Sequence, residues 1–94
     1  MDDAITDDAA AGRFELALDG GVAFVAYRRE GAVLFLTHAE VPAGLAGRGL
    51  GSRLVRAVLE LVRGRGERVV PRCPFVARYV ARHPEYSDLV APRT

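Results

Sequence analysis

The chain from residue 13 to residue 41 contains three apolar runs separated by two turn signals. In the first run apolar and polar residues alternate, which is typical of a strand with one buried face. Asp19-Gly20-Gly21 and Glu30-Gly31 are the turn signals. Pro42 cannot donate to a strand ladder, so the third strand should end there. We therefore expect an antiparallel meander whose strands cover residues 14–18, 22–28 and 32–41.

A helical period replaces this alternation after the glycine-rich stretch at residues 43–51. From about residue 49 to residue 65, apolar residues recur every three or four positions, which predicts an amphipathic helix. The short apolar run at 68–71 predicts a further strand, and a second helix should follow over 75–82. Residues 86–90 could form a last short strand. Together these elements predict an α+β fold.

The length and composition of the chain are those of one small domain. The 94 residues leave little room for a second core, and 50% hydrophobic with 27% charged residues is typical of a globular protein. Residues 1–12 are rich in Asp and Ala, so we expect a disordered acidic tail before a single domain over 13–94. No apolar stretch approaches the roughly 20 residues that span a bilayer, and the acidic start is unlike a secretory signal. We expect a cytoplasmic protein with no membrane partner.

Two compositional features limit the chemistry. One cysteine, Cys73, excludes an internal disulfide, and with only two histidines we expect no metal cofactor. All 13 basic residues are arginine, and most of them follow residue 46, so this half could meet a polyanion. Few aromatic residues lie among these arginines and Trp is absent. Solvated helix faces explain the arginines better than a nucleic-acid partner, which we do not expect.

The strongest motif is the glycine loop between the third strand and the long helix. Gly47, Gly49 and Gly51 let the backbone turn tightly, and a helix N-terminus adds about half a positive charge. The stretch lacks the Gly-Lys-Ser/Thr of a P-loop, and no parallel βαβ unit precedes it as in a dinucleotide fold. The loop therefore predicts a phosphate cradle of another kind. A flexible loop before an ordinary helix is the structural alternative.

Because three predicted antiparallel strands precede this loop and an amphipathic helix follows it, the chain resembles the GNAT N-acetyltransferase superfamily, and more closely its minimal one-domain branch. The resemblance rests on residues 41–54, 70–76 and 82–86. Residues 46–51 are similar to the acetyl-CoA pyrophosphate motif, Gln/Arg-x-x-Gly-x-Gly/Ala, although Ala46 stands where most members have Gln or Arg. The resemblance implies a GNAT-like fold: an antiparallel three-stranded meander, the glycine loop, a central helix, a further strand and a C-terminal helix.

The resemblance also implies acetyl-CoA as cosubstrate. The loop amides would wrap the pyrophosphate, and Arg48 and Arg53 would add charge near it. The backbone of Glu40 and Val41 would hydrogen-bond the pantetheine arm like an added strand. Tyr79, on the second helix, could reach the cofactor arm or the leaving sulfur, or it could pack in the core. The cofactor-binding residues that we expect are Val41, Ala46, Gly47, Arg48, Gly49, Leu50, Gly51, Ser52, Arg53 and Tyr79.

Acetyl transfer from a thioester needs a base for the attacking amine and a donor for the oxyanion. Glu40 is the first candidate for the base, direct or through water, and His38 is the second, because residues two apart on a strand share a face. A solvated strand-end carboxylate and a packing histidine are the alternatives. Cys73 could be a nucleophile that takes the acetyl group, a proton donor to the leaving thiolate, or a small buried hydrophobe.

We therefore expect an acetyl-CoA-dependent N-acetyltransferase that moves an acetyl group to a primary amine by direct transfer. The chain has no room for the helices that larger members insert between their first strands, so acceptor contacts should be few. This favours an amine on a protein or peptide, such as a lysine or an N-terminus, or a small polyamine. A non-catalytic acyl-CoA-binding or interaction module is the alternative.

Overall fold

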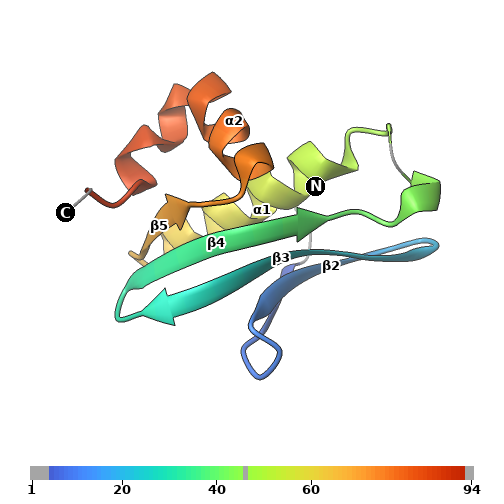
Figure 1. The fold of residues 1–94 in the computed structure, drawn as a ribbon, viewed down its shortest axis with the longest axis horizontal. Helices are drawn as coiled ribbons and strands as arrows, with labels where there is room; N and C mark the ends of the chain where they lie inside the picture. The colour runs from blue at the N-terminus through green and yellow to red at the C-terminus, as the bar shows by residue number, and fades with distance from the viewer. Residues whose placement is uncertain (1–4, 46, 93–94) are drawn as a thin grey trace.

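The computed structural model describes residues 5–45 and 47–92, which form one mixed sheet and two α-helices (Figure 1). The strands lie in the order β1-β2-β3-β4-β5, and every neighbouring pair is antiparallel except the parallel pair β4 and β5. Their bounds are β1 Ile5–Asp8, β2 Arg13–Leu18, β3 Gly21–Glu30, β4 Val33–Glu40 and β5 Arg68–Pro71. The α-helices are α1 Leu50–Gly64 and α2 Pro74–Arg82, and the 3₁₀ helices are η1 Ala43–Leu45 and η2 Pro84–Leu89.

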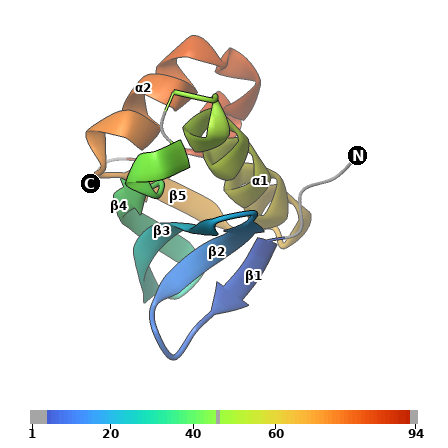
Figure 2. The same cartoon turned by 90° about the vertical axis from the view of Figure 1, so that its right-hand side faces the viewer.

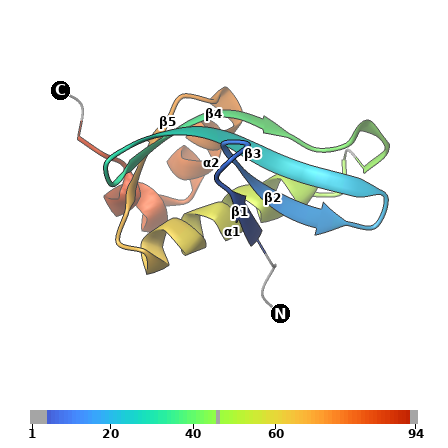
Figure 3. The same cartoon turned by 90° about the horizontal axis from the view of Figure 1, so that it is seen from below.

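Both α-helices and η2 pack on one face of the sheet, so the fold has two layers (Figure 3). The core lies between these layers and has no buried polar or charged residue among the described positions. The other face of the sheet, which we call the outer face, has no helix of the described chain on it (Figure 1). None of the described helices is long and apolar enough to span a membrane. The fully buried large side chains are Phe14, Leu34, Leu36, Leu54, Leu59, Val25, Val55, Val58, Val62, Val69 and Val76.

The elements predicted from periodicity agree with the structure over most of residues 13–82. The three-stranded meander is confirmed, and its third strand ends at Glu40, before Pro42. The strand at Arg68–Pro71 is also confirmed, and α1 and α2 lie within one residue of the expected bounds. The fold class, α+β, is the one expected.

The acidic tail expected over residues 1–12 is wrong for residues 5–8, which form β1 (Figure 2). This strand pairs antiparallel with β2, and Ile5 packs against the core. Asp7 accepts hydrogen bonds from Tyr27 and Arg65, so its charge is held by tertiary contacts that composition does not reveal. Residues 1–4 lie outside the described part of the chain.

The last strand considered for residues 86–90 is also wrong, because this segment forms η2. Pro84 opens it with a backbone angle suited to a helical turn. Tyr86 and Leu89, three residues apart, are both buried, which fits the three-residue period of a 3₁₀ helix. Only Val90 makes a strand-like contact, a single parallel bridge to Val69.

Candidate functional site

The site begins where β4 and β5 separate. The two strands pair only as far as Leu36 and Pro71, after which the chain turns from β5 into α2 (Figure 1). The backbone N–H groups of Arg72 and Cys73 both donate to the carbonyl of Leu36, at 3.0 and 2.9 Å. Beyond Leu36, β4 continues to Glu40, and no other strand of the described chain pairs with that edge. This edge therefore offers free backbone groups to an extended ligand.

A β-bulge at Thr37 decides which way the end of β4 faces. The register with β3 shifts here: Tyr27 is opposite Leu36, whereas Ala26 is opposite His38. The extra residue reverses the inward and outward alternation, so Ala39 packs toward the core. Without it, residues 38 and 40 would continue the core-facing row of Leu34 and Leu36. The bulge instead turns His38 and Glu40 to the outer face.

His38 and Glu40 contact each other on that face. The His38 Nε2 and Glu40 Oε1 atoms lie 3.1 Å apart, and the two side chains are 59% and 61% exposed. The His38 ring also lies against Phe24, with centroids 5.9 Å apart. The two base candidates thus form one hydrogen-bonded pair beside the unpaired edge, in contact with water. This pairing follows the predicted shared face, whereas the bulge that aims it has no sequence signal that we can identify.

Cys73 sits differently from the other catalytic candidates. Its side chain is only 6% exposed and belongs to the core cluster between the sheet and the helices. It is the N-cap residue of α2, where its side chain makes no capping hydrogen bond. Burial among apolar side chains favours the small hydrophobe over the nucleophile among the three alternatives. The proton-donor role stays open.

The glycine loop leads from the end of β4 to an uncapped helix. Gly47 and Gly49 have φ angles of 82° and 71°, a left-handed conformation that glycine adopts without strain. Gly49 is the N-cap of α1, yet no side chain caps this helix and no acidic residue lies in its first turn. The N–H groups at the start of α1 are therefore available to an anion. Ala46 lies outside the described residues.

Gly51 has a different role from the other two glycines. A Cβ atom there would lie 2.8 Å from the ring of Phe75, at the start of α2. Gly51 therefore lets the first turns of the two helices approach closely, whereas a Cβ on Gly47 or Gly49 would meet nothing within 4 Å. Of the three glycines, Gly47 and Gly49 therefore have the tight-turn backbone that was predicted for the loop. Arg48, Ser52 and Arg53 are exposed, whereas Leu50 is partly buried.

A small cavity of about 80 Å³ separates the first turn of α1 from α2. Tyr79 lines it and is 7% exposed, and its ring stacks on His83 with centroids 3.9 Å apart. Burial raises the pKa of the Tyr79 hydroxyl. Tyr79 thus shares the cavity with Ser52, and its ring packs in the core as one alternative expected. Its contact with the cofactor arm or the leaving sulfur stays a prediction. The cavity is lined by Ser52, Phe75, Arg78, Tyr79, Arg82 and His83.

Arg78 and Arg82 were missed by the sequence reasoning. They are four residues apart on α2 and both line this cavity, next to the uncapped end of α1. In the part of the chain that the structure describes, neither guanidinium has a carboxylate within ion-pair distance. The i, i+4 spacing was the available signal, but a solvated helix face shows the same spacing. Only the packing of α2 against the first turn of α1 distinguishes the two cases.

The remaining predicted residue, Val41, follows the last residue of β4 and packs against the core. Apart from Cys73 in the core, the structure therefore groups the described candidates in two places. One group lies along the end of β4, and the other lies around the glycine loop and the cavity beside α2. Among the described residues, no cluster of His, Cys, Asp and Glu suits a metal ion.

Comparisons with known proteins agree with this fold. The family model of the GCN5-related N-acetyl-transferases matches residues 13–89. A GCN5-like protein from Staphylococcus aureus, whose structure was solved in solution by NMR, superimposes with a TM-score of 0.70 at 21% identity. The alignment covers 97% of this chain and 90% of that one, and at this identity it supports the fold alone. A comparison with curated protein sequences found no significant match. Since the family model spans most of the chain, this protein belongs to the GCN5-related N-acetyltransferase family.

Proposed function

We propose that this protein is an acetyl-CoA-dependent N-acetyltransferase that acetylates a primary amine by direct transfer. The observation that carries the proposal is the continuity between the unpaired edge of β4 and the uncapped N-terminus of α1. A pantetheine arm carries amides that pair with a strand edge, and a pyrophosphate suits free N–H groups at a helix start. Both parts of acetyl-CoA therefore find matching backbone groups along one path.

The glycine loop would hold the phosphates. The amides of residues 47–52 would supply donors, with that of Ala46 expected from the sequence motif alone, and the exposed Arg48 and Arg53 would add positive charge. Arg78 and Arg82 approach the same region from α2, next to Ser52. The missing Gln or Arg side chain at position 46 leaves the binding to backbone amides and to these neighbouring arginines.

The pantetheine arm would lie along the backbone from Thr37 to Val41, with the thioester near the point where Leu36 leaves β5. An acceptor can then approach from the outer face, where His38 and Glu40 lie. Because no helix of the described chain crosses that face, the approach is open to water and to an amine on a small molecule, peptide or protein.

Glu40, directly or through water, takes the proton from the acceptor ammonium. His38 orients the Glu40 carboxylate, or relays the proton, through the hydrogen bond between the two side chains. The amine nitrogen then forms a bond to the thioester carbon, the carbon–sulfur bond breaks, and the nitrogen releases its second proton to water. The departing thiolate takes a proton. Tyr79 is the candidate donor, because a tyrosine hydroxyl carries its proton at neutral pH and can regain it from water.

A coupled assay of CoA release with a panel of amines tests this proposal. Replacing Glu40 with Gln should lower kcat/KM by about 10²-fold or more, because it removes a positioned base. Glu15→Gln is the matched control, since Glu15 is another acid on the outer face, accepts a hydrogen bond from Arg13 and lines neither the groove nor the cavity. Equal activity of the two variants would remove Glu40 from the mechanism. Tight acetyl-CoA binding without transfer to any amine would instead favour the non-catalytic module.

A further inference from the structure

We propose that a groove on the outer face of the sheet selects the acceptor, and that the acceptor is an α-amino acid with an apolar side chain. This inference rests on the proposed acetyl transfer and specifies the substrate class of the same site. It assigns Arg72 as the residue that recognises the acceptor carboxylate. The argument depends on the position of the groove, on its lining, and on the charges at its ends.

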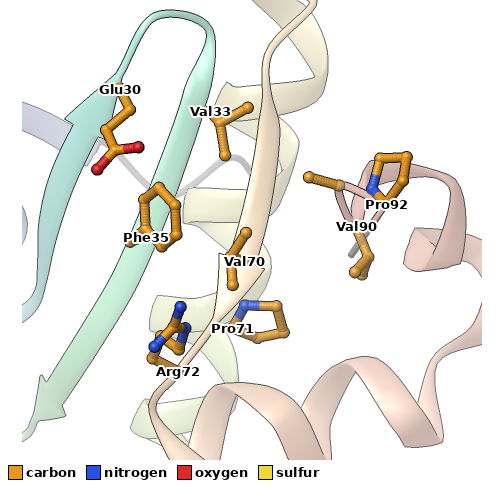
Figure 4. A pocket seen from close by; sticks show the side chains of 9 residues that line it. Glu30, Val33, Phe35, Val70, Pro71, Arg72, Val90 and Pro92 are labelled. Carbon is orange, nitrogen blue, oxygen red and sulfur yellow. The ribbon is translucent and has the colours of Figure 1, made fainter. Parts of the chain in front are cut away.

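The groove has a volume of about 620 Å³ and lies over β4, β5 and the segment that follows η2 (Figure 4). Its lining is mostly apolar, and Phe35 lies between Glu30 at one end and Arg72 at the other (Figure 4). Such a surface suits an apolar side chain held by a few polar groups. The apolar residues that line it are Val33, Phe35, Val70, Pro71, Val90, Ala91 and Pro92.

Arg72 stands at the end of the groove where β4 and β5 separate. Its backbone N–H donates to the carbonyl of Leu36, the last residue of β4 that pairs with β5. Its guanidinium lies over the ring of Phe35, 5.4 Å from the centroid. The thioester carbon in the proposed mechanism would lie near the same point. An anionic group of the acceptor that binds the Arg72 guanidinium would therefore be close to the reacting amine.

Of the two arginines that lie over Phe35, only Arg72 lacks a carboxylate partner among the described residues. Arg28 also lies over this ring, at 4.7 Å, but its Nη1 donates to Glu30 at 2.8 Å. For Arg72 the described residues provide no carboxylate within ion-pair distance. Stacking on an aromatic ring leaves the N–H edge of a guanidinium available for bidentate contact with a carboxylate. The ring therefore orients Arg72, and no carboxylate of the described chain occupies its guanidinium.

The outer face therefore has opposite charges on the two sides of the point where the strands separate. The His38–Glu40 pair lies toward the end of β4, and Arg72 lies toward the groove. An acceptor that fits this arrangement carries a carboxylate for Arg72 and an apolar group for the groove. Its amine meets the thioester near Leu36 and passes its proton to Glu40 through water, because Glu40 lies four residues further along β4. A lysine side chain or a polyamine lacks the carboxylate, and Arg72 would repel a second cationic group.

The direct test compares phenylalanine with phenylalanine amide and phenethylamine, the last two lacking the free carboxylate, in the CoA-release assay. We expect kcat/KM for phenylalanine to exceed that of either analogue by about 10- to 100-fold, the usual loss for one charge-assisted contact. In Arg72→Gln this preference should fall to within about threefold, because the amide side chain offers no charge. Arg28→Gln is the matched control over the same ring and should keep the preference.

Binding of the products gives a readout that does not need turnover. Calorimetry with N-acetylphenylalanine and N-acetylphenethylamine should show the same carboxylate preference in the native protein and its loss in Arg72→Gln. Circular dichroism checks that the variant is folded. Equal rates with phenylalanine and phenethylamine, or a preference for lysine side chains or peptide N-termini, would overturn the inference but leave acetyl transfer intact. Acetyl-CoA binding without acetylation of any amine would instead refute the proposed function.

Discussion

The two ends of α1 differ in how their polar groups are satisfied. At its C-terminal end, Arg65 donates to Asp7 at 2.9 Å, Tyr27 donates to Asp7 at 2.5 Å, and Arg29 pairs with Glu67. These contacts join α1 to β1, β3 and the start of β5. At the N-terminal end, no side chain caps the helix. The arginines that face this end from α2 also have no carboxylate partner among the described residues.

This difference separates the part of the molecule that maintains the fold from the part that is available to a ligand. Unsatisfied donors cost little where water reaches them, and they can be satisfied by an incoming anion. Satisfied donors hold the sheet edge and the helix together but offer nothing to a substrate. Substitutions at the C-terminal end should therefore change stability, whereas substitutions at the N-terminal end should change binding.

The largest effect should come from Phe14→Ala, in the core near the C-terminal end of α1. Phe14 is fully buried and its ring lies 4.6 Å from that of Tyr27. Removing the ring should lower the free energy of unfolding by about 3–5 kcal/mol, through lost burial and the cavity left behind. Urea unfolding measures it. Phe24→Ala, on the outer face, is the control and should cost much less; equal costs would contradict the assignment of the two faces.

Asp7→Asn should have the next largest effect, about 1–3 kcal/mol, because it weakens the hydrogen bonds from Tyr27 and Arg65. Burial acts to raise the pKa of Asp7, but those hydrogen bonds outweigh it and leave the pKa below its usual value of 3.8. The stabilisation is therefore complete above the usual value and is lost as the pH falls through the lowered one. Urea unfolding at several pH values should show a shallower acid loss in the variant; identical pH profiles would exclude this role.

Arg82→Gln should weaken acetyl-CoA binding by about tenfold while leaving the free energy of unfolding unchanged, because one charge-assisted contact to a phosphate is lost. Calorimetry measures the affinity. Arg13→Gln is a suitable control, since Arg13 is engaged by Glu15 on the outer face, far from α2 in the fold. An unchanged affinity in Arg82→Gln would remove the cavity beside α2 from the cofactor site.

The smallest effect should be that of Tyr86→Phe, about 1 kcal/mol of unfolding free energy. The Tyr86 hydroxyl donates to Glu60 at 2.6 Å and joins η2 to α1. Burial, together with this hydrogen bond, raises the pKa of Tyr86 to about 12, so the native hydroxyl should stay protonated well above pH 10. A spectrophotometric titration of tyrosinate absorbance checks this. Loss of acetyl-CoA affinity in the variant would show that η2 also shapes the site.

Periodicity was sufficient for the meander and for α1, because their apolar residues repeat with the period of the structure. It was not sufficient for β1, whose charged residues are paired only in three dimensions, as Asp7 is with Arg65. The candidate site also combines one feature that residue spacing predicts with one that it does not. The shared face of His38 and Glu40 follows from their spacing, whereas the direction of that face depends on the bulge at Thr37.

The phosphate cradle at the start of α1 is tested most directly by calorimetric titration with acetyl-CoA, comparing the native protein with Gly49→Val and Gly64→Val. Gly49 has a positive φ at the N-terminal end of α1, and Gly64 is the last residue of the same helix, without a positive φ and with open space around it. Circular dichroism should check that both variants are folded. We expect micromolar binding by the native protein and by Gly64→Val, and none by Gly49→Val. No binding by the native protein, or equal binding by the folded Gly49→Val variant, would contradict the cradle.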